Sequence, residues 1–336
     1  MKILYFLHEA WEEQYIKTKL SGHEVHVFAN TTPQEAQFAA SESDAEVLCV
    51  FVGDKVDASV LDRLPKLKLI ATRSTGFDHI DVAEAKKRGV TVASVPAYGA
   101  NTVAEFAFAL ILALSRRVCA AHERVSRDHS FSLEGLAGFD LCGKTLGLVG
   151  CGRIGVHTAQ IARGFGMEVL VFDERQDAAL AEKTGFSYAP FADVLARADI
   201  ISLHVPYLPS THHLINAEAF AKMKRGAYLI NTSRGAVVDT EALVAALKLG
   251  TLGGAGLDVL EEEGDMQDEF ALVSGHPKEE EMKIVLANHY LASHPSVIVT
   301  PHIAFDTQEA KQRILDTTAD NITQFVAGTP QNVVGA

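Results

Sequence analysis

The sequence predicts an α/β protein with two domains, each built on a doubly wound parallel sheet. Two observations lead to this fold class. Short apolar runs rich in β-branched residues alternate with segments of helical spacing along most of the chain, and this alternation is typical of parallel sheets covered by helices. The chain has 336 residues, which is enough for two domains of about 150 residues each.

The expected strands form two series, one in each half of the chain. Each run is about the length of a buried strand. The first series comprises residues 2–6, 24–28, 47–51, 68–72 and 90–93, and the second comprises residues 145–149, 168–172, 200–203, 227–230, 254–259 and 297–300.

The segments between the strands carry helical patterns. The clearest covers residues 82–89, where Gly89 supplies a left-handed C-terminal cap. A helix at 103–114, capped by Asn101 or Thr102, is apolar on nearly every face and is expected to be buried between domains or subunits. A looser segment is expected at 117–141, and helices are expected at 156–164, at 282–291 and from residue 308 onward.

The order of these elements predicts that one domain is inserted into the other. We expect residues 1–100 and 305–336 to form an outer domain and residues 101–304 to form the inserted domain. The acidic, irregular stretch at 261–281 indicates a surface insertion, which extends over 264–295 with the helix that follows it.

Composition excludes several function classes. Thirty basic against forty-three acidic residues give a formal net charge of −13, which argues against nucleic acid or an anionic membrane surface as a partner. The four cysteines show no metal-ligand spacing, so we expect free thiols in a reducing compartment and no metal site. No membrane span or signal peptide is visible, and a cytoplasmic protein is expected.

A glycine-rich turn carries the first chemical signal. Residues 150–155 read Gly-Cys-Gly-Arg-Ile-Gly and lie between an expected strand and a helix. In a Rossmann domain these glycines form a tight turn, admit a pyrophosphate and let the helix pack closely on its strand. Asp173 ends the next strand, where a carboxylate accepts ribose hydroxyls and repels a 2′-phosphate. NAD is therefore favoured over NADP, although Arg175 leaves some NADP use open.

Polar side chains follow several later strands, and ligands bind at the carboxyl ends of strands in open α/β sheets. Arg234 follows the strand at 227–230, and its planar guanidinium suits a carboxylate. Three glutamates follow the strand at 254–259, and His302 follows the strand at 297–300. Taken singly, each fits a surface arginine, a solvated acidic run or a structural histidine equally well. His204 ends another strand, where it would line the cofactor.

These motifs together resemble the D-isomer-specific 2-hydroxyacid dehydrogenases, and most closely the D-lactate dehydrogenases among them. The resemblance covers nearly the whole chain and implies an NAD-binding Rossmann domain inserted in a flavodoxin-like substrate domain, as well as a homodimer built around the apolar helix after Asn101. It implies that Arg234, Glu263 and His302 are catalytic, with Glu261 and Glu262 as surface acids. The cofactor contacts it implies, together with the glycines and His204, are Arg153, Ile154, Asp173, Val205, Pro206, Thr211, Thr232, Ser233 and Asp258.

The same resemblance implies the substrate contacts. The backbone N–H groups of Thr75 and Gly76, together with Arg234, would hold the carboxylate of a 2-oxo acid. Tyr98 and Phe305 match aromatic positions of the lactate-type members, and hinge packing explains them equally well. His302 would donate a proton while hydride arrives from NADH, and Glu263 would orient the ring and favour its charged form.

Other functions stay open at this point. Within the family, a glyoxylate or hydroxypyruvate reductase is the nearest rival to pyruvate reduction. A non-catalytic, NAD-sensing protein similar to transcriptional co-repressors would keep the same fold and even the three catalytic residues. A glycine-rich methyltransferase is a more distant alternative, and it would not predict Arg234, Glu263 and His302 each at a strand end. Turnover of a 2-oxo acid discriminates among these classes.

Overall fold

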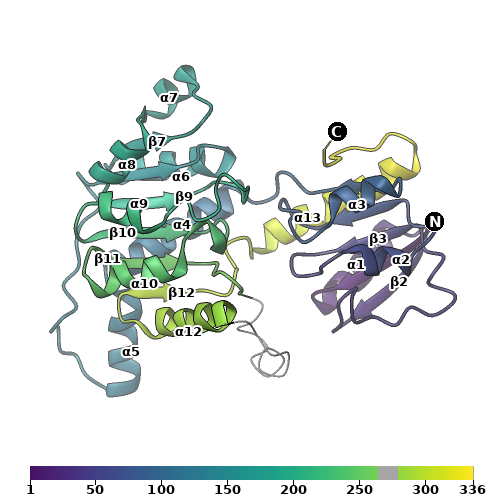
Figure 1. The fold of residues 1–336 in the computed structure, drawn as a ribbon, viewed down its shortest axis with the longest axis horizontal. Helices are drawn as coiled ribbons and strands as arrows, with labels where there is room; N and C mark the ends of the chain where they lie inside the picture. Colours follow the sequence, from purple (N-terminus) through teal and green to yellow (C-terminus); the bar gives the residue numbers. More distant parts are fainter. Residues whose placement is uncertain (264–278, 336) are drawn as a thin grey trace. The chain divides into compact units, whose positions relative to one another are not determined.

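The computed structural model describes residues 1–263 and 279–335 and divides into two compact units (Figure 1). Unit 1 comprises residues 1–98 and 307–336, and unit 2 comprises residues 99–306. Residues 99, 100, 305 and 306 therefore belong to unit 2, and each expected domain boundary lies two residues away from the observed one. Part of the expected insertion at 264–295 lies outside the described residues. No described helix is long and apolar enough to cross a membrane.

Unit 1 contains a five-stranded parallel sheet in the order β2-β1-β3-β4-β5, which is the flavodoxin-like order. Ile3 and Tyr5 face one layer of helices while Leu4 and Phe6 face the other, as alternation along a strand requires. Helices α2 and α3 cover one face, and α1 and α13 cover the opposite face. The elements are β1 (Lys2–Leu7), α1 (Ala10–Lys19), β2 (Glu24–Ala29), β3 (Val47–Val50), α2 (Ala58–Asp62), β4 (Leu69–Thr72), α3 (Val82–Lys87), β5 (Thr91–Ala93) and α13 (Gln308–Val326).

Unit 2 contains a seven-stranded parallel sheet in the order β12-β11-β10-β9-β6-β7-β8. The order reverses between β6 and β9, and the crevice at such a reversal is where dinucleotides bind. The first half of the unit contains α4 (Ala100–Ser115), α5 (Val118–Asp128), β6 (Thr145–Val149), α6 (Arg153–Gly164), β7 (Glu168–Phe172), α7 (Ala178–Thr184), β8 (Ser187–Tyr188) and α8 (Phe191–Arg197). The second half contains β9 (Ile200–Leu203), α9 (Ala217–Lys222), β10 (Ala227–Asn231), the 3₁₀ turn η1 (Gly235–Val237), α10 (Thr240–Lys248), β11 (Leu252–Leu257), α12 (Glu279–Ser293) and β12 (Val297–Val299).

Three local predictions in unit 2 were wrong, and one strand was not predicted. Gly99, not Asn101 or Thr102, is the N-cap of α4, and Asn101 instead donates a side-chain hydrogen bond to Glu105 one turn on. The segment at 117–141 contains a helix, α5, whose side chains are largely exposed. The two-residue strand β8 is too short to leave a periodic signal. Strand β11 begins at 252 and ends at 257 rather than running over 254–259.

Helix α4 is buried by its own unit. Phe108, Leu110, Ile111 and Leu114 pack in one cluster with α6 and the strands of the same sheet. This packing within unit 2 accounts for much of the apolar character of α4. The homodimer expected around this helix stays a prediction.

Candidate active site

The glycine-rich turn lies between β6 and α6, and packing explains two of its glycines. Gly150 has a φ of +94°, and a Cβ there would lie 2.6 Å from the carbonyl oxygen of His204. A Cβ on Gly155 would lie 2.4 Å from the carbonyl oxygen of Gly150. At Gly152 a Cβ would meet nothing within 4 Å, so this part of the turn is open at the N-terminus of α6. Backbone N–H groups at such an end bind phosphate.

Asp173 follows β7 and is hydrogen-bonded to this turn. Its Oδ2 accepts from the backbone N–H of Cys151 at 2.6 Å, and its Oδ1 accepts from the N–H of Arg175 at 2.8 Å. The structure therefore brings the predicted ribose-binding acid to the glycine-rich turn. Arg153 and Ile154 begin α6 immediately after Gly152.

The segment after β9 lies against the same turn. The Nε2 of His204 is 2.9 Å from the hydroxyl of Ser202, and burial lowers the pKa of His204 to about 4. The imidazole is therefore neutral near pH 7. The carbonyl group of His204 lies beside Gly150, which is why a Cβ at position 150 would meet it. The hydroxyl of Thr211 donates to the carbonyl of Pro206 at 2.7 Å and closes the turn after Val205.

Arg234 lies in a loop at the carboxyl end of β10, and Asn231 shapes that loop. The Oδ1 of Asn231 accepts from the N–H and the hydroxyl of Ser233, at 3.0 and 2.8 Å, and its Nδ2 donates to the carbonyl of Arg234 at 2.9 Å. Asn231 is buried, and sequence reasoning missed it. Among the described residues, the buried hydroxyl of Thr232 has no hydrogen-bond partner.

Glu263 and His302 form a pair, as the family resemblance implied for a carboxylate that orients an imidazole. The Oε1 of Glu263 is 2.7 Å from the Nδ1 of His302, and both side chains are partly exposed. His302 has a φ of +54°, an uncommon conformation for a residue with a side chain. The turn that carries the imidazole must therefore be held by its surroundings.

Asp258 holds that turn. Its buried carboxylate accepts from the hydroxyl of Thr300 at 2.6 Å and from the N–H groups of Ile303 and Ala304, at 2.9 and 2.8 Å. Its carbonyl accepts from the N–H of His302 at 2.9 Å. Burial raises the pKa of Asp258, and these hydrogen bonds oppose the rise. A residue predicted as a cofactor contact thus holds the turn that carries His302.

Glu261 corrects the expectation of a surface acid. It is 9% exposed, and its Oε1 is 2.6 Å from the Nε2 of His213. An acidic run gives no indication of which member turns inward, because burial depends on what the fold places beside it. Glu262 is exposed, as expected.

The predicted carboxylate-binding loop lies in unit 1, directly after β4. The hydroxyl of Thr75 donates to the carbonyl of Val95 at 2.7 Å, and the hydroxyl of Ser74 donates to the carbonyl of Gly76 at 2.6 Å. These bonds hold the loop in a defined conformation. Tyr98 ends the same unit, whereas Phe305 belongs to unit 2.

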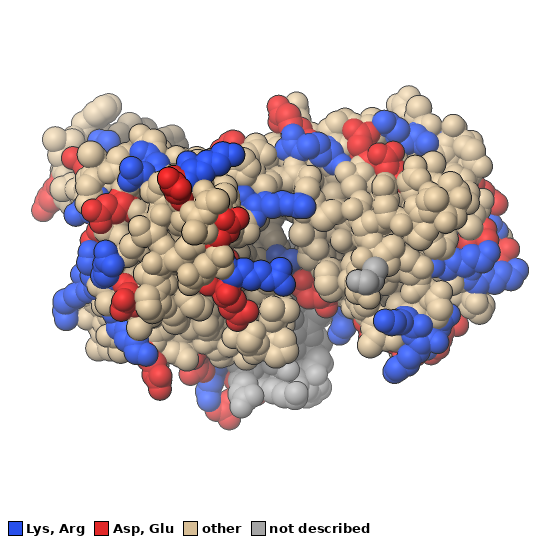
Figure 2. All heavy atoms as spheres, turned by 90° about the horizontal axis from the view of Figure 1, so that it is seen from above, with Lys and Arg blue, Asp and Glu red and all other residues tan. Residues whose placement is uncertain are grey.

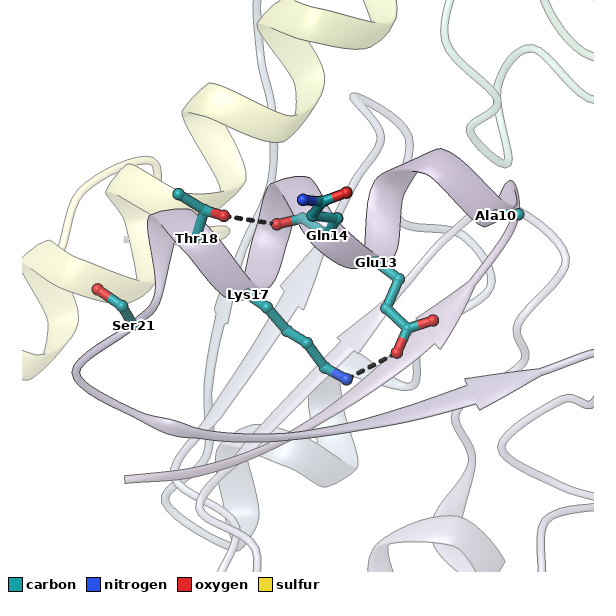
Figure 3. Close-up of a pocket in the computed structure, with 6 residues that line it drawn as sticks. All are labelled: Ala10, Glu13, Gln14, Lys17, Thr18 and Ser21. Carbon is teal, nitrogen blue, oxygen red and sulfur yellow. Dashed lines mark hydrogen bonds and ion pairs between the residues drawn. The ribbon is translucent and has the colours of Figure 1, made fainter.

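A hollow on α1 of unit 1 contains none of the predicted site residues. A 2.6 Å ion pair between Lys17 and Glu13 lies along it (Figure 3). On the face drawn in Figure 2, Lys and Arg side chains are interspersed with Asp and Glu, which does not favour a nucleic-acid surface. The residues that line the hollow are Ala10, Glu13, Gln14, Lys17, Thr18 and Ser21.

The residues of unit 2 fit a dinucleotide. Gly152, where the backbone is open, is the N-cap of the twelve-residue helix α6, and Asp173 is hydrogen-bonded to the same turn. The unpartnered hydroxyl of Thr232 is a buried polar group of the kind that a bound ligand satisfies. When bound, NAD would be held by these groups and by the loop at 204–211.

Comparison with known proteins agrees with this arrangement. Residues 108–304 match the model of the D-isomer specific 2-hydroxyacid dehydrogenase NAD-binding domain. The chain is 40% identical over 330 residues to 2-hydroxyacid dehydrogenase homolog 1 of Schizosaccharomyces pombe, covering 97% of both chains. It is 40% identical over 308 residues to a glyoxylate reductase of Thermofilum pendens, covering 90% of this chain and 85% of that protein.

A solved structure is also similar over nearly the whole chain. The D-lactate dehydrogenase of Aquifex aeolicus, crystallised with NAD and lactic acid, superimposes with a TM-score of 0.87 at 36% identity and covers 97% of this chain and 96% of its own. The matches to the two relatives and to the solved structure extend over both units. The chain belongs to the D-isomer-specific 2-hydroxyacid dehydrogenase family, and it is an NAD-dependent D-2-hydroxyacid dehydrogenase.

Proposed function

We propose that this enzyme reduces a small 2-oxo acid to the D-2-hydroxy acid, with pyruvate and D-lactate as its preferred pair. The observation that carries the proposal is the 2.7 Å contact between Glu263 and the Nδ1 of His302. Because Glu263 occupies Nδ1, the Nε2 of the same ring is the nitrogen that can pass a proton to substrate. NADH, when bound, supplies the hydride.

His302 and the residues around it have separate roles in the proposed reaction. The charged form of His302 donates its proton to the carbonyl oxygen of the 2-oxo acid, and the Glu263 carboxylate orients the ring through its contact with Nδ1. The guanidinium of Arg234 binds the substrate carboxylate and stabilises the negative charge that develops on the carbonyl oxygen. The N–H groups of Thr75 and Gly76 are proposed to bind the carboxylate as well. In the reverse direction His302 is the base.

The proposed test follows NADH loss with pyruvate, glyoxylate and hydroxypyruvate at matched concentrations, with chiral analysis of the product. We expect fast reduction of pyruvate to D-lactate alone. Faster turnover of glyoxylate or hydroxypyruvate keeps the mechanism and reassigns the substrate, a second candidate that the similarity to a glyoxylate reductase supports. NADH binding without turnover of any 2-oxo acid contradicts the enzymatic proposal and favours a cofactor-sensing protein.

We also propose that the enzyme is a homodimer. Among the described residues, exposed apolar side chains gather on α5 and the segment after it, where Val118, Phe131 and Leu133 are 53%, 85% and 84% exposed. Such a cluster on one segment is typical of a protein–protein interface. Sedimentation equilibrium tests the proposal: we expect a dimer for the native chain and a monomer for Phe131→Ser/Leu133→Ser. A monomeric native chain contradicts it.

A further inference from the structure

Glu261 and His213 form a second carboxylate–imidazole pair beside the first. The Oε1 of Glu261 is 2.6 Å from the Nε2 of His213, and its Oε2 accepts from the hydroxyl and the N–H of Thr240, at 2.6 and 3.2 Å. Three donors from two other segments therefore engage one buried carboxylate. A buried charge is retained only where it is paired and hydrogen-bonded, so the position of this side chain is strongly constrained.

The backbone of the same residue is held from two sides. A Cβ on Gly235 would lie 2.0 Å from the carbonyl carbon of Leu260, so the loop that carries Arg234 packs directly on the peptide between Leu260 and Glu261. On the other side, the buried Asn288 of α12 donates through its Nδ2 to the carbonyl of Glu261 at 2.7 Å. The Arg234 loop and the Glu263 turn are thus in direct backbone contact.

His213 ties the network to the same loop. Its N–H donates to the carbonyl of Ala236 at 2.9 Å, and the N–H of Ile215 donates to the carbonyl of Val237 at 3.0 Å. His213 has a φ of +49°, a conformation that surrounding contacts must maintain. A closed path therefore runs from the Glu261 carboxylate through His213 to the 3₁₀ turn after Arg234, and back through Gly235 to the Glu261 backbone.

We propose that Glu261 is a positioning residue that fixes Arg234 and Glu263 relative to each other. Glu263 lies two residues after Glu261, and its Oε2 accepts from the N–H of Leu260 at 3.3 Å while its Oε1 contacts His302. A shift of the peptide between Leu260 and Glu261 moves Glu263, and through it the His302 ring. The inference rests on the proposed function, because it assigns Glu261 to the same reaction.

The first arm of the experiment measures kcat and KM for pyruvate and the Kd for NADH. We expect Glu261→Ala to lower kcat about 10²-fold, the effect of a misplacement near 1 Å, and to leave the Kd for NADH within about twofold. Glu261→Gln should recover most of kcat, because its amide can accept from Thr240 and donate to a neutral His213. The control is Glu241→Ala, an exposed acid next to Thr240 on α10, for which we expect kcat within about twofold of the native value.

The second arm is independent of turnover. The ¹H–¹⁵N signal of the His302 imidazole, assigned by its loss in His302→Gln, reports the contact with Glu263. We expect this signal to move in Glu261→Ala in the direction seen for Glu263→Gln, and to stay near the native position in Glu261→Gln. If native protein reduces no 2-oxo acid, the proposed function fails while this arm still decides the role of Glu261.

Two further variants keep the test decisive if Glu261→Ala does not fold. His213→Gln and Thr240→Val each remove one part of the network, and each should lower kcat at unchanged affinity for NADH. The proposal is overturned by a native kcat in the first foldable variant of this set, or by an unmoved His302 signal. It is also overturned if kcat falls only in proportion to NADH affinity and thermal stability, because that is the signature of general destabilisation.

Discussion

The two units contain the same kind of sheet, but they differ in the exposure of the cationic side chain that follows one strand of each. In unit 2 the polar groups that follow β10 and β12, Arg234 and His302, are partly exposed. In unit 1 the charge that follows β4, Arg73, is 2% exposed and is paired with the buried Glu12. Arg73 also donates to the hydroxyl of Tyr5 at 3.0 Å and lies over the Tyr5 and Phe51 rings.

This difference shows that the same kind of sheet can bury a charged side chain in an ion pair or leave polar side chains partly exposed. Arg234 and His302 keep part of their surface exposed, whereas Arg73 is buried against Glu12 and stabilises its own loop. If Thr75 and Gly76 bind the substrate carboxylate as we propose, they do so through backbone groups, whereas Arg234 in unit 2 offers a side chain. Four predictions test this difference between the two units, beginning with the largest expected effect.

We expect the partly exposed imidazole of His302 to be needed for catalysis and to contribute little to the stability of the fold. We expect His302→Gln to lower kcat for pyruvate reduction about 10²- to 10⁴-fold, the usual contribution of a general acid. NADH affinity should change little, because the glycine-rich turn and Asp173 are untouched. Single-turnover kinetics and NADH titration check both statements, and retention of more than a tenth of native kcat would contradict the role of His302.

The buried cation of unit 1 should matter mainly for folding. We expect Arg73→Met to reduce the free energy of unfolding by about 3–5 kcal/mol, because Glu12 then remains buried without its partner. The double variant Arg73→Met/Glu12→Gln removes both charges and should recover part of that loss. Denaturant unfolding measures both, and an equal or greater loss in the double variant would refute the explanation.

His204 shows that unit 2 also contains an imidazole whose charged form is disfavoured by burial. Its pKa is lowered to about 4 from an ordinary 6.5, so the folded state binds its proton less tightly than the unfolded state does. Its contribution to stability is complete above pH 6.5 and is lost as pH falls toward 4, on the order of 3 kcal/mol in all. In His204→Asn the free energy of unfolding should depend less on pH between 6.5 and 4, and an unchanged dependence would contradict this.

Asp173 combines a structural role with an expected binding role, because its carboxylate accepts hydrogen bonds from its own loop and is also expected to bind ribose. Asp173→Ala should weaken NADH binding about tenfold, which corresponds to roughly 1.4 kcal/mol, and should narrow the preference for NADH over NADPH because a carboxylate repels the 2′-phosphate. Asp173→Asn is the matched variant, since its amide oxygen still accepts from the turn. Fluorescence titration with both cofactors measures the ratio, and an unaltered preference in Asp173→Ala would count against this reading.

Prediction from sequence succeeded where the pattern is local. The strands at 145–149, 168–172 and 200–203 have the predicted bounds, because a short apolar run bounded by polar residues has few alternatives inside a sheet. It failed for the cap of α4, where Asn101 and Thr102 both have capping side chains and the backbone at Gly99 decides the start. It failed for β8, because two residues carry no period.

In the candidate site, too, some residues could be predicted from the sequence and others could not. Asp173, Arg234 and His302 were identifiable because each follows a strand and because the motifs together resemble one family. Asn231 and Glu261 were not, because their roles arise from groups far away in the chain, such as His213 and Asn288 for Glu261. No local pattern encodes those contacts.

The sequence by itself determined the two series of parallel strands, the glycine-rich turn and the chemical identity of the groups that the proposed reaction needs, because these depend on residue type and short spacing. Only the tertiary structure decided which charged side chains are buried and which stay exposed. The three neighbouring acids at 261–263 illustrate this: one is buried against His213, one is exposed and one contacts His302. Burial and pairing depend on segments that the chain brings together from a distance.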